Sequence, residues 1–283
     1  MRSNDVNSVA PACIQRTTLS TFLLWICMVS TSWAQDEDPS KVDLGSRTAK
    51  DGFRNEDEIR DKFNAWKTDK DAKAWLKAMD YKLQDIIEVK AIKPHGYKAD
   101  VEVTITARTG KSVERLSIKL VSSENGFNQI DKRWLDTYAK MWEMPDDVVK
   151  PLKYFVGELR PYKSGRHKER MYLNELSKES RKAVLDFFQK HKKEIVSDLL
   201  SGDGEHSANW FMVTFKAYKD PRWLIRSSTD AADFFGEGEV VMTRAGNLKI
   251  GRIGMQRKGG DNGRKTARML QFKINPVQLF DAK

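Results

Sequence analysis

Two charged residues on neighbouring strand-like runs of the sequence are suited to phosphodiester chemistry. Residues 98–120 read KADVEVTITARTGKSVERLSIKL, with Asp100 at the start of one alternating run and Lys119 near the end of the next. Phosphodiester hydrolysis needs a divalent ion that activates water and neutralises developing charge, and a carboxylate anchors that ion while a lysine orients the water. An ordinary cross-strand ion pair is the alternative interpretation.

The position two residues before the lysine is Ser117, where such an enzyme would carry Glu, Asp or Gln. Strand side chains alternate, so Ser117 and Lys119 are expected on one face. Glu102, two residues after Asp100, is the nearest same-face carboxylate that could compensate, whereas Glu114 is expected on the opposite face. The sequence therefore predicts catalytic residues Asp100, Ser117 and Lys119, and metal ligands Asp100, Glu102 and the backbone carbonyl of Ile118.

A helix is expected just before this hairpin. Asn55 is a plausible N-cap with Glu58 three residues later, which is a capping-box spacing. Ile59 and Phe63 then recur at helical spacing. Glu56 and Glu58 are candidates for a further metal ligand if this helix packs beside the hairpin.

The remaining elements indicate an α/β protein with a central mixed β-sheet flanked by helices. Residues 99–107 and 113–121 are predicted to form a hairpin whose turn is centred on Gly110. Further helices are predicted at 72–79, 127–144 and 178–200, and further strands at 86–92, 210–218, 222–226, 238–243, 248–258 and 269–274.

The segment 122–134, SSENGFNQIDKRW, carries residue types that suit reading of DNA bases. Phe127 after a glycine can act as a wedge between base pairs. The amides of Asn128 and Gln129 and the ammonium of Lys132 are donors and acceptors for base edges. A helix N-terminus with a hydrophobic staple would explain the same pattern without DNA.

The segment 255–268 is the second candidate for binding DNA. Its run QRKGGDNGRK combines four basic residues with three glycines, which suits close backbone approach to phosphates together with polar base contacts. A charged turn between strands is the alternative. The candidate residues are Gln256, Arg257, Lys258, Asp261 and Asn262.

Composition narrows the chemistry further. Fifty basic residues against forty acidic ones give a net charge of +10, which fits a polyanionic partner, nucleic acid before a membrane surface. Both cysteines, Cys13 and Cys27, precede residue 28, and the four histidines show no zinc-ligand spacing. Metal chemistry must therefore rest on carboxylates, for which Mg²⁺ is the expected ion.

The N-terminal stretch is predicted to lie outside the functional domain. Residues 17–34, TTLSTFLLWICMVSTSWA, read as a secretory signal with cleavage after Ala34, and the run is too short for a convincing membrane span. The alternative, which we favour, is a start placed too early, with Met28 as the true start. We expect residues 1–40 to be a leader, 41–283 a single domain, and the protein to be cytoplasmic with no membrane association.

Four long stretches together resemble one enzyme family: LGSRTAKDGFRNE, GYKADVEV, KLVSSENGFNQIDKRWLDTYAKMW and QRKGGDNGRKTARMLQFKINPVQLFD. They occur in the expected order and span almost all of the chain after the leader. The sequence is similar to the HinP-type, GCGC-cutting type II restriction endonucleases, which are related to MspI and belong to the PD-(D/E)XK nuclease superfamily.

The resemblance implies a restriction-endonuclease-like fold that cuts duplex DNA with Mg²⁺ at a short palindrome, GCGC, and leaves a two-base 5′ overhang. It implies a partner methyltransferase and a monomer or a dimer formed on DNA. Asp100 and Lys119 match the family's catalytic pattern, whereas Ser117 replaces its Gln and Ala99 its Ser. Because Gln is only a weak neutral ligand and Ser could act through a water, activity is expected to survive the change at Ser117, at a rate no higher than with Gln. The family's DNA-reading loop is matched by Phe127, Gln129 and Lys132.

Other functions fit parts of the same pattern. A repair or junction-resolving nuclease of this fold would cut by DNA shape and not by sequence. A DNA-binding protein whose catalytic site has decayed through Ser117 would bind without cutting. A secreted nuclease is favoured only if the leader is a true signal.

Overall fold

The computed structural model describes residues 39–94, 98–202, 204–205, 207–260 and 264–281, and all of them belong to one compact unit, Glu37–Lys283. The predicted leader therefore lies outside the described residues apart from its last two positions. Within the described part of the chain, no helix is long and apolar enough to cross a membrane.

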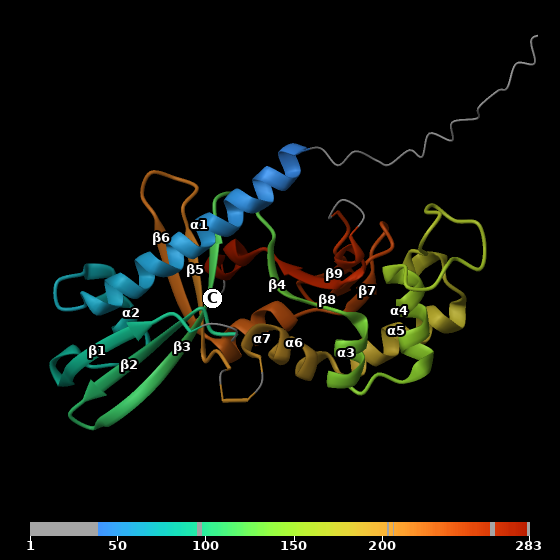
Figure 1. Cartoon of the computed structure of the whole chain (residues 1–283). Helices are drawn as coiled ribbons and strands as arrows, with labels where there is room; N and C mark the ends of the chain where they lie inside the picture. The colour runs from blue at the N-terminus through green and yellow to red at the C-terminus, as the bar shows by residue number, and fades with distance from the viewer. Residues whose placement is uncertain (1–38, 95–97, 203, 206, 261–263, 282–283) are drawn as a thin grey trace, which may run out of the picture. The chain divides into compact units, whose positions relative to one another are not determined.

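The described strands form two five-stranded sheets (Figure 1). The first sheet has the order β1-β2-β3-β5-β6, in which β3 and β5 run parallel and the other neighbours antiparallel. Its strands are β1 Ile86–Ile92, β2 Val101–Ala107, β3 Gly110–Val121, β5 Trp210–Phe215 and β6 Arg222–Ser227. The α/β class and a mixed sheet are confirmed.

The second sheet is wholly antiparallel and has the order β4-β10-β9-β8-β7. Its strands are β4 Asn128–Arg133, β7 Val240–Met242, β8 Leu248–Ile250, β9 Ile253–Arg257 and β10 Leu270–Ile274. The sequence pattern located most of these strands, but it gave no sign that they form a separate sheet. Pairing between segments far apart in sequence is not encoded in local periodicity.

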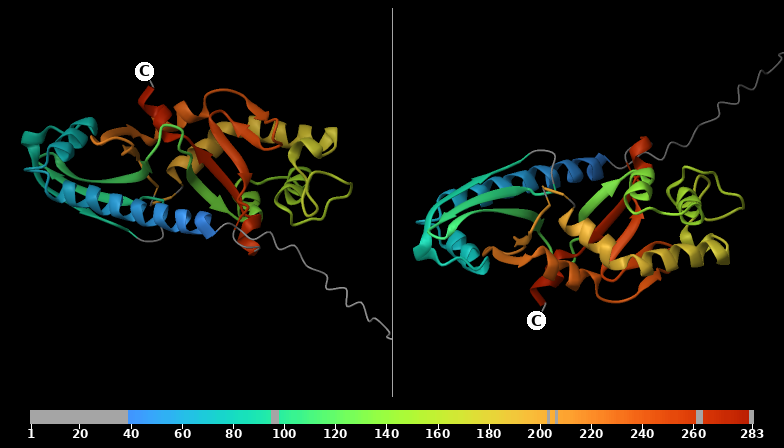
Figure 2. Two further views of the ribbon diagram at one scale, coloured as in Figure 1. Left: turned by 90° about the horizontal axis from the view of Figure 1, so that it is seen from above. Right: turned by 90° about the horizontal axis from the view of Figure 1, so that it is seen from below.

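Helices cover both sheets (Figures 1 and 2). The long helix α1 contacts β1, β2 and β3, and α2 contacts α1 and β6. The helices after β4 pack on one another and on both sheets: α5 contacts β7, α6 contacts β4 and β5, and α7 contacts β5 and β6. Their bounds are α1 Pro39–Asn64, α2 Lys70–Ala78, α3 Leu135–Met141, α4 Asp146–Val156, α5 Lys178–Lys190, α6 Lys192–Ser201 and α7 Ser228–Gly236.

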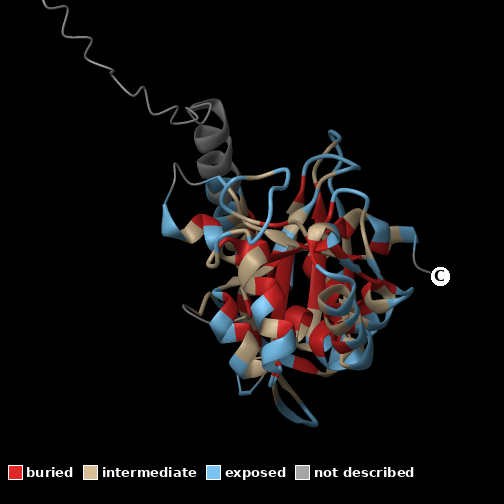
Figure 3. Cartoon of the chain, turned by 90° about the vertical axis from the view of Figure 1, so that its right-hand side faces the viewer, coloured by how far each residue is buried: buried red, intermediate tan, exposed pale blue. Residues whose placement is uncertain are grey.

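The buried apolar residues (Figure 3) form two clusters. One lies between α1, α2 and the first sheet, and the other joins residues of β3 and β5 to the second sheet and to the helices after β4. Under α1 and α2, the helix residues Ile59, Phe63 and Trp75 pack on strand residues such as Val103 and Ile118. Burying large apolar side chains on both elements stabilises the contact by roughly 1.5–3 kcal/mol per side chain. This core fixes α1 against the hairpin.

The hairpin is confirmed with a small change at its turn. Arg108 and Thr109 form a two-residue turn, and Gly110 already pairs with Ala107. The strand β3 outlasts β2 because its second half, from Leu116 onward, also pairs with β5. The catalytic candidates therefore lie where β2 begins, beside the middle of the sheet.

Asn55 is not an N-cap, which corrects the prediction. It lies inside α1, is 2 % exposed, and its side-chain amide donates to Thr214 Oγ1 on β5 at 3.2 Å. A polar residue that finds a buried partner on another element no longer competes with the helix backbone. The helix instead begins at Pro39, and proline is favoured in a first turn.

Two predicted helices also differ from the structure. Residues 128–133 form β4, because pairing with β10 outweighs the helical spacing, and the helix starts only at Leu135. The predicted helix 178–200 is two helices that meet at His191. Its apolar face is preserved, since α5 and α6 both contribute to the same core.

Candidate active site

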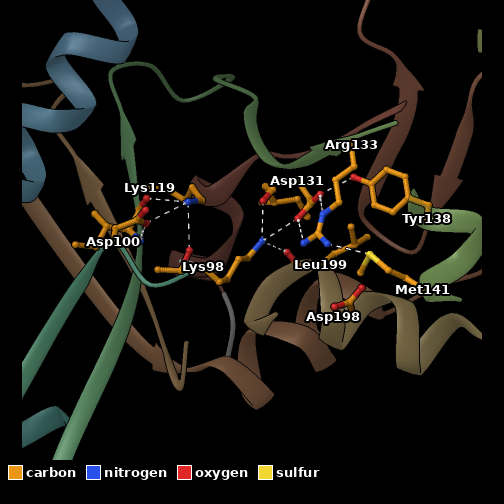
Figure 4. Close-up of polar contacts among 12 residues, drawn as sticks. Lys98, Asp100, Lys119, Asp131, Arg133, Tyr138, Met141, Asp198 and Leu199 are labelled. Atoms are coloured by element: carbon orange, nitrogen blue, oxygen red, sulfur yellow. Dashed lines mark hydrogen bonds and ion pairs between the residues drawn. The ribbon is translucent and has the colours of Figure 1, made fainter. Parts of the chain in front are cut away.

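The structure brings Asp100 and Lys119 together at the start of β2 (Figure 4). The Lys119 ammonium lies 3.6 Å from Asp100 Oδ2, and this same oxygen accepts a hydrogen bond from the backbone N–H of Ile118 at 2.6 Å. The side chains of Lys119 and Asp100 are 14 % and 26 % exposed. The pair is therefore partly buried, and both side chains keep some exposure to solvent.

Ser117 holds the lysine and does not face solvent. Its hydroxyl accepts a hydrogen bond from Lys119 Nζ at 3.2 Å, and the residue is only 1 % exposed. The same ammonium donates to the backbone carbonyl of Ile118 at 2.9 Å. Ser117, Ile118 and Asp100 therefore surround one ammonium.

A second carboxylate reaches the site from α1. The pKa of Glu56 is raised by burial and by the nearby charge of Asp100, and a 3.1 Å ion pair with Lys93 and the charge of Lys119 oppose this rise. Repulsion between two carboxylates that share a site is typical of places that hold a cation. Glu58, the other candidate on α1, is instead paired with Lys216 at 2.6 Å.

The carboxylates of the hairpin itself are engaged elsewhere. Glu102 lies two residues from Asp100, but Arg115 on the paired strand donates to it at 3.1 Å. Glu114 accepts hydrogen bonds from Asn209 and from the indole of Trp210, each at 2.6 Å. Glu56, whose pKa responds to the charge of Asp100, is therefore the better second carboxylate.

The donors around Asp100 suit a hard cation. Carboxylate, hydroxyl and carbonyl oxygens are the ligands that Mg²⁺ prefers, and Asp100, Glu56, Ser117 and Ile118 supply only such atoms. Within the described ranges, no group of three or more acidic, histidine or cysteine side chains is placed to hold a metal. A magnesium ion here would therefore keep several waters, as it usually does.

The segment 122–134 presents its aromatic residue to solvent. Phe127 is 64 % exposed at the entrance to β4. Asn128 is structural, since its side chain donates to the carbonyl of Leu120 at 2.9 Å and ties β4 to β3. The exposed phenyl ring of Phe127 is therefore free to contact a partner, as a wedge would require. The amide of Asn128 is less suited to reading bases than predicted, because it already bonds to Leu120.

The two segments predicted to bind DNA meet across the second sheet. Gln271 on β10 donates to Gln129 on β4 at 2.7 Å, and its own carbonyl oxygen accepts from Gln256 on β9 at 3.5 Å. Lys132 is the direct cross-strand neighbour of Gln271. We call Gln129, Lys132, Gln256 and Gln271 the polar ladder. Gln271 was missed in the sequence because its role depends on strands that are remote along the chain.

The glycine-bearing loop after β9 comes directly after the strand that carries Gln256 of the polar ladder. Gly259 has a φ of +65° and open space around it, so a side chain there would be strained although nothing blocks the approach of a partner. Lys258 and Gly259 are held by backbone bonds to Met269 and Ala267. Asp261 and Asn262 lie outside the described residues.

A second basic group, missed in the sequence, lies beside Arg257. The pKa of Arg257 is lowered, mainly by burial and also by the positive charge of Arg170. The two guanidinium groups therefore lie close enough to repel each other. Arg170 and Arg166 both lie over the ring of Tyr172, at 4.1 and 3.9 Å from its centroid. The run of basic residues between 160 and 170 was the available signal.

The backbone resembles a solved nuclease. The crystal structure of the restriction endonuclease MspI in complex with its cognate DNA matches with a TM-score of 0.56 and 15 % identity, covering 77 % of this chain and 87 % of that one. A likeness at this identity shows a restriction-endonuclease-like fold. A comparison with curated proteins gave no match.

The family follows from the sequence itself. The model of the R.HinP1I restriction endonuclease family matches residues 79–280, which include both sheets and every candidate site residue except Glu56 and Glu58 on α1. The chain belongs to the R.HinP1I restriction endonuclease family and is a type II restriction nuclease.

Proposed function

We propose that this protein cuts duplex DNA at a short palindrome, GCGC, with Mg²⁺, and leaves a two-base 5′ overhang. The observation that carries the proposal is the Asp100–Lys119 pair, 3.6 Å apart, with Glu56 beside it in a member of a restriction endonuclease family. The DNA-bound state of the similar MspI structure supports duplex DNA as the partner.

Asp100, Glu56 and the carbonyl of Ile118 would hold the magnesium ion. Glu102 is a further candidate ligand, but its carboxylate is paired with Arg115 in this structure. The ion supplies charge neutralisation at the phosphate and activation of water. The Ile118 carbonyl, which now accepts from Lys119, would be the backbone ligand, and the ammonium of Lys119 would lie next to the reacting phosphate.

Lys119 would orient the attacking water and stabilise charge on the phosphate oxygens. Its ammonium is held by Ser117 and Asp100, so little rearrangement is needed as the reaction proceeds. Preorganised donors of this kind contribute on the order of 2.7–4 kcal/mol to a barrier in other hydrolases.

The polar ladder, with Phe127 beside β4, would read the bases. Amide and ammonium groups can distinguish base edges in the major groove, and an exposed phenyl ring can enter between base pairs. The basic groups at 160–170 and after β9 would contact phosphates, which fix orientation without reading sequence.

The test compares wild type with Lys119→Ala on phage DNA in Mg²⁺. Discrete fragments from wild type, with GCGC at the cut ends, are the expected result. Lys119→Ala should lower cleavage by roughly a thousandfold while it keeps site-specific binding in magnesium-free buffer. Undiminished cleavage by the variant would remove the catalytic role from Lys119.

Other outcomes select the other functions. A smear of fragments would indicate a nuclease that cuts by shape, and tight binding without cutting would indicate a decayed site.

We also propose a cognate DNA methyltransferase as the genetic partner, since a cell that makes this enzyme must protect its own sites. Whether a monomer or a DNA-induced dimer cuts is measured by sedimentation with and without a palindromic duplex.

A further inference from the structure

One buried lysine joins the catalytic hairpin to the second sheet. Lys98, two residues before Asp100, donates to the backbone carbonyl of Ile130 on β4 at 2.8 Å and to that of Leu199 on α6 at 2.5 Å. Its ammonium lies 3.6 Å from Asp131 Oδ2, and its side chain is 14 % exposed. The chain entering the catalytic strand is thus fastened to the strand that carries part of the polar ladder.

Asp131, the acidic partner of Lys98, is also held by several contacts (Figure 4). Asp131 is 9 % exposed and accepts from Arg133 at 3.0 and 3.2 Å and from the Tyr138 hydroxyl at 2.5 Å. Tyr138 stacks on Trp142 with ring centroids 4.7 Å apart. Because these partners lie on β4 and α3, the carboxylate cannot follow Lys98 unless the strand moves too.

The lysine stem is also held. Gly202, which ends α6 with a φ of +72°, lies so close that a Cβ there would be 3.0 Å from Lys98 Cβ. The ammonium meets the C-terminal end of α6, where helix carbonyls attract a cation. Lys98 is therefore held by contacts with both α6 and β4.

We propose that Lys98 and Asp131 are positioning residues that make cleavage depend on correct seating of β4 on its DNA site. The proposal rests on the proposed function, because it requires that β4 contacts bases and that Asp100 acts in cleavage. Gln129 and Lys132 flank the residues that hold Lys98, so a shift of β4 reaches Asp100 through a single side chain. Contiguity suggests such coupling, and only a measured effect on discrimination demonstrates it.

The experiment measures single-turnover cleavage of a duplex carrying the site cut by wild type and of duplexes with one base pair changed. Lys98→Met should lower the rate on the correct site by about tenfold or more, since small displacements of a reacting group cost about that much or more. The rate on changed sites should fall less, so the ratio of the two rates drops by at least about fivefold. Binding of the correct duplex in magnesium-free buffer should stay within about threefold.

The control is Lys62→Met, which removes a lysine bonded to Asp71 at 2.7 Å on the α1–α2 side. This variant should keep the wild-type ratio. If Lys98→Met is not folded by circular dichroism, Asp131→Asn decides, since it keeps the shape and should lower the ratio in the same direction.

A merely structural role would lower the cleavage rate of all duplexes by the same factor. The ratio of the rate on the correct site to the rate on changed sites would then stay unchanged in the folded variants. That result would overturn this inference and leave the proposed function standing. If wild type cuts no DNA, the proposed function fails and the inference falls with it. The two failures are therefore distinguishable.

Discussion

At the catalytic hairpin, the ammonium of Lys119 is shared among three oxygen-bearing neighbours: Asp100, Ser117 and the Ile118 carbonyl. The family's glutamine at the serine position is expected to reach toward the metal, whereas the shorter hydroxyl here contacts the lysine. In this structure Ser117 contacts the lysine, and we propose that it positions Lys119 more directly than it would position a metal ion.

Replacing Ser117 tests this division. Ser117→Ala removes one hydrogen bond to a charged group, so we expect a cleavage rate lower by about tenfold to a hundredfold. Ser117→Gln should raise the rate at low magnesium, because the amide oxygen extends further along the side chain. The rates are measured against Mg²⁺ concentration, and an unchanged or lower rate for Ser117→Gln would show that serine does not weaken the metal site.

The carboxylates of Glu56 and Glu102 have different surroundings: Glu56 lies near Asp100, whereas Glu102 accepts a hydrogen bond from Arg115. Because the pKa of Glu56 is raised, the native metal-free protein keeps this proton to higher pH than the unfolded chain, and stability is lost as pH rises through the native pKa. We expect Glu56→Gln in metal-free buffer at neutral pH to melt no lower than wild type. Mg²⁺ should raise the melting temperature of wild type and of Glu102→Gln but not of Glu56→Gln. A Mg²⁺-dependent rise in Glu56→Gln would contradict its role as ligand.

At the scale of elements, α1 decides whether Glu56 reaches the hairpin. Its apolar face packs under the first sheet, and Asn55 bonds to Thr214 in the buried contact between α1 and β5. Sequence periodicity indicated the helix but not its orientation, because the buried polar contact joins residues 159 positions apart.

Thr214→Val should destabilise the protein by about 1–3 kcal/mol, because the Asn55 amide would be left buried without its acceptor. Urea unfolding followed by circular dichroism measures the decrease. The double variant Asn55→Leu with Thr214→Val serves as the control, since it removes both polar groups and should recover part of the stability. A decrease of equal size in both variants would show that the hydrogen bond is not the cause.

At the scale of the whole molecule, the net charge of +10 favours a polyanion, and the structure shows where part of it gathers. Arg170 and Arg257 are brought together from separate regions, and exposed basic residues at 160, 163 and 168 extend the group. Such a surface raises affinity for any duplex and leaves sequence preference unchanged.

The triple variant Arg160→Gln, Lys163→Gln, Lys168→Gln should weaken binding of all duplexes alike. The slope of log affinity against log salt should fall by roughly 0.9 for each phosphate that the variant no longer neutralises. Fluorescence anisotropy at several salt concentrations measures it. Lys182→Gln, whose lysine is paired with Asp186 on α5, is the control and should keep the wild-type slope. An unchanged slope in the triple variant would place the DNA elsewhere.

The sequence by itself determined the hairpin, the α/β class and the family, because short-range alternation and long matching motifs encode them. Asp100, Ser117 and Lys119 are near one another in any folded form of that hairpin. The tertiary structure alone decided the second carboxylate, the polar ladder and the bridge from Lys98 to Asp131. These depend on pairing between distant strands and on helix packing, where long-range burial outweighs local propensity.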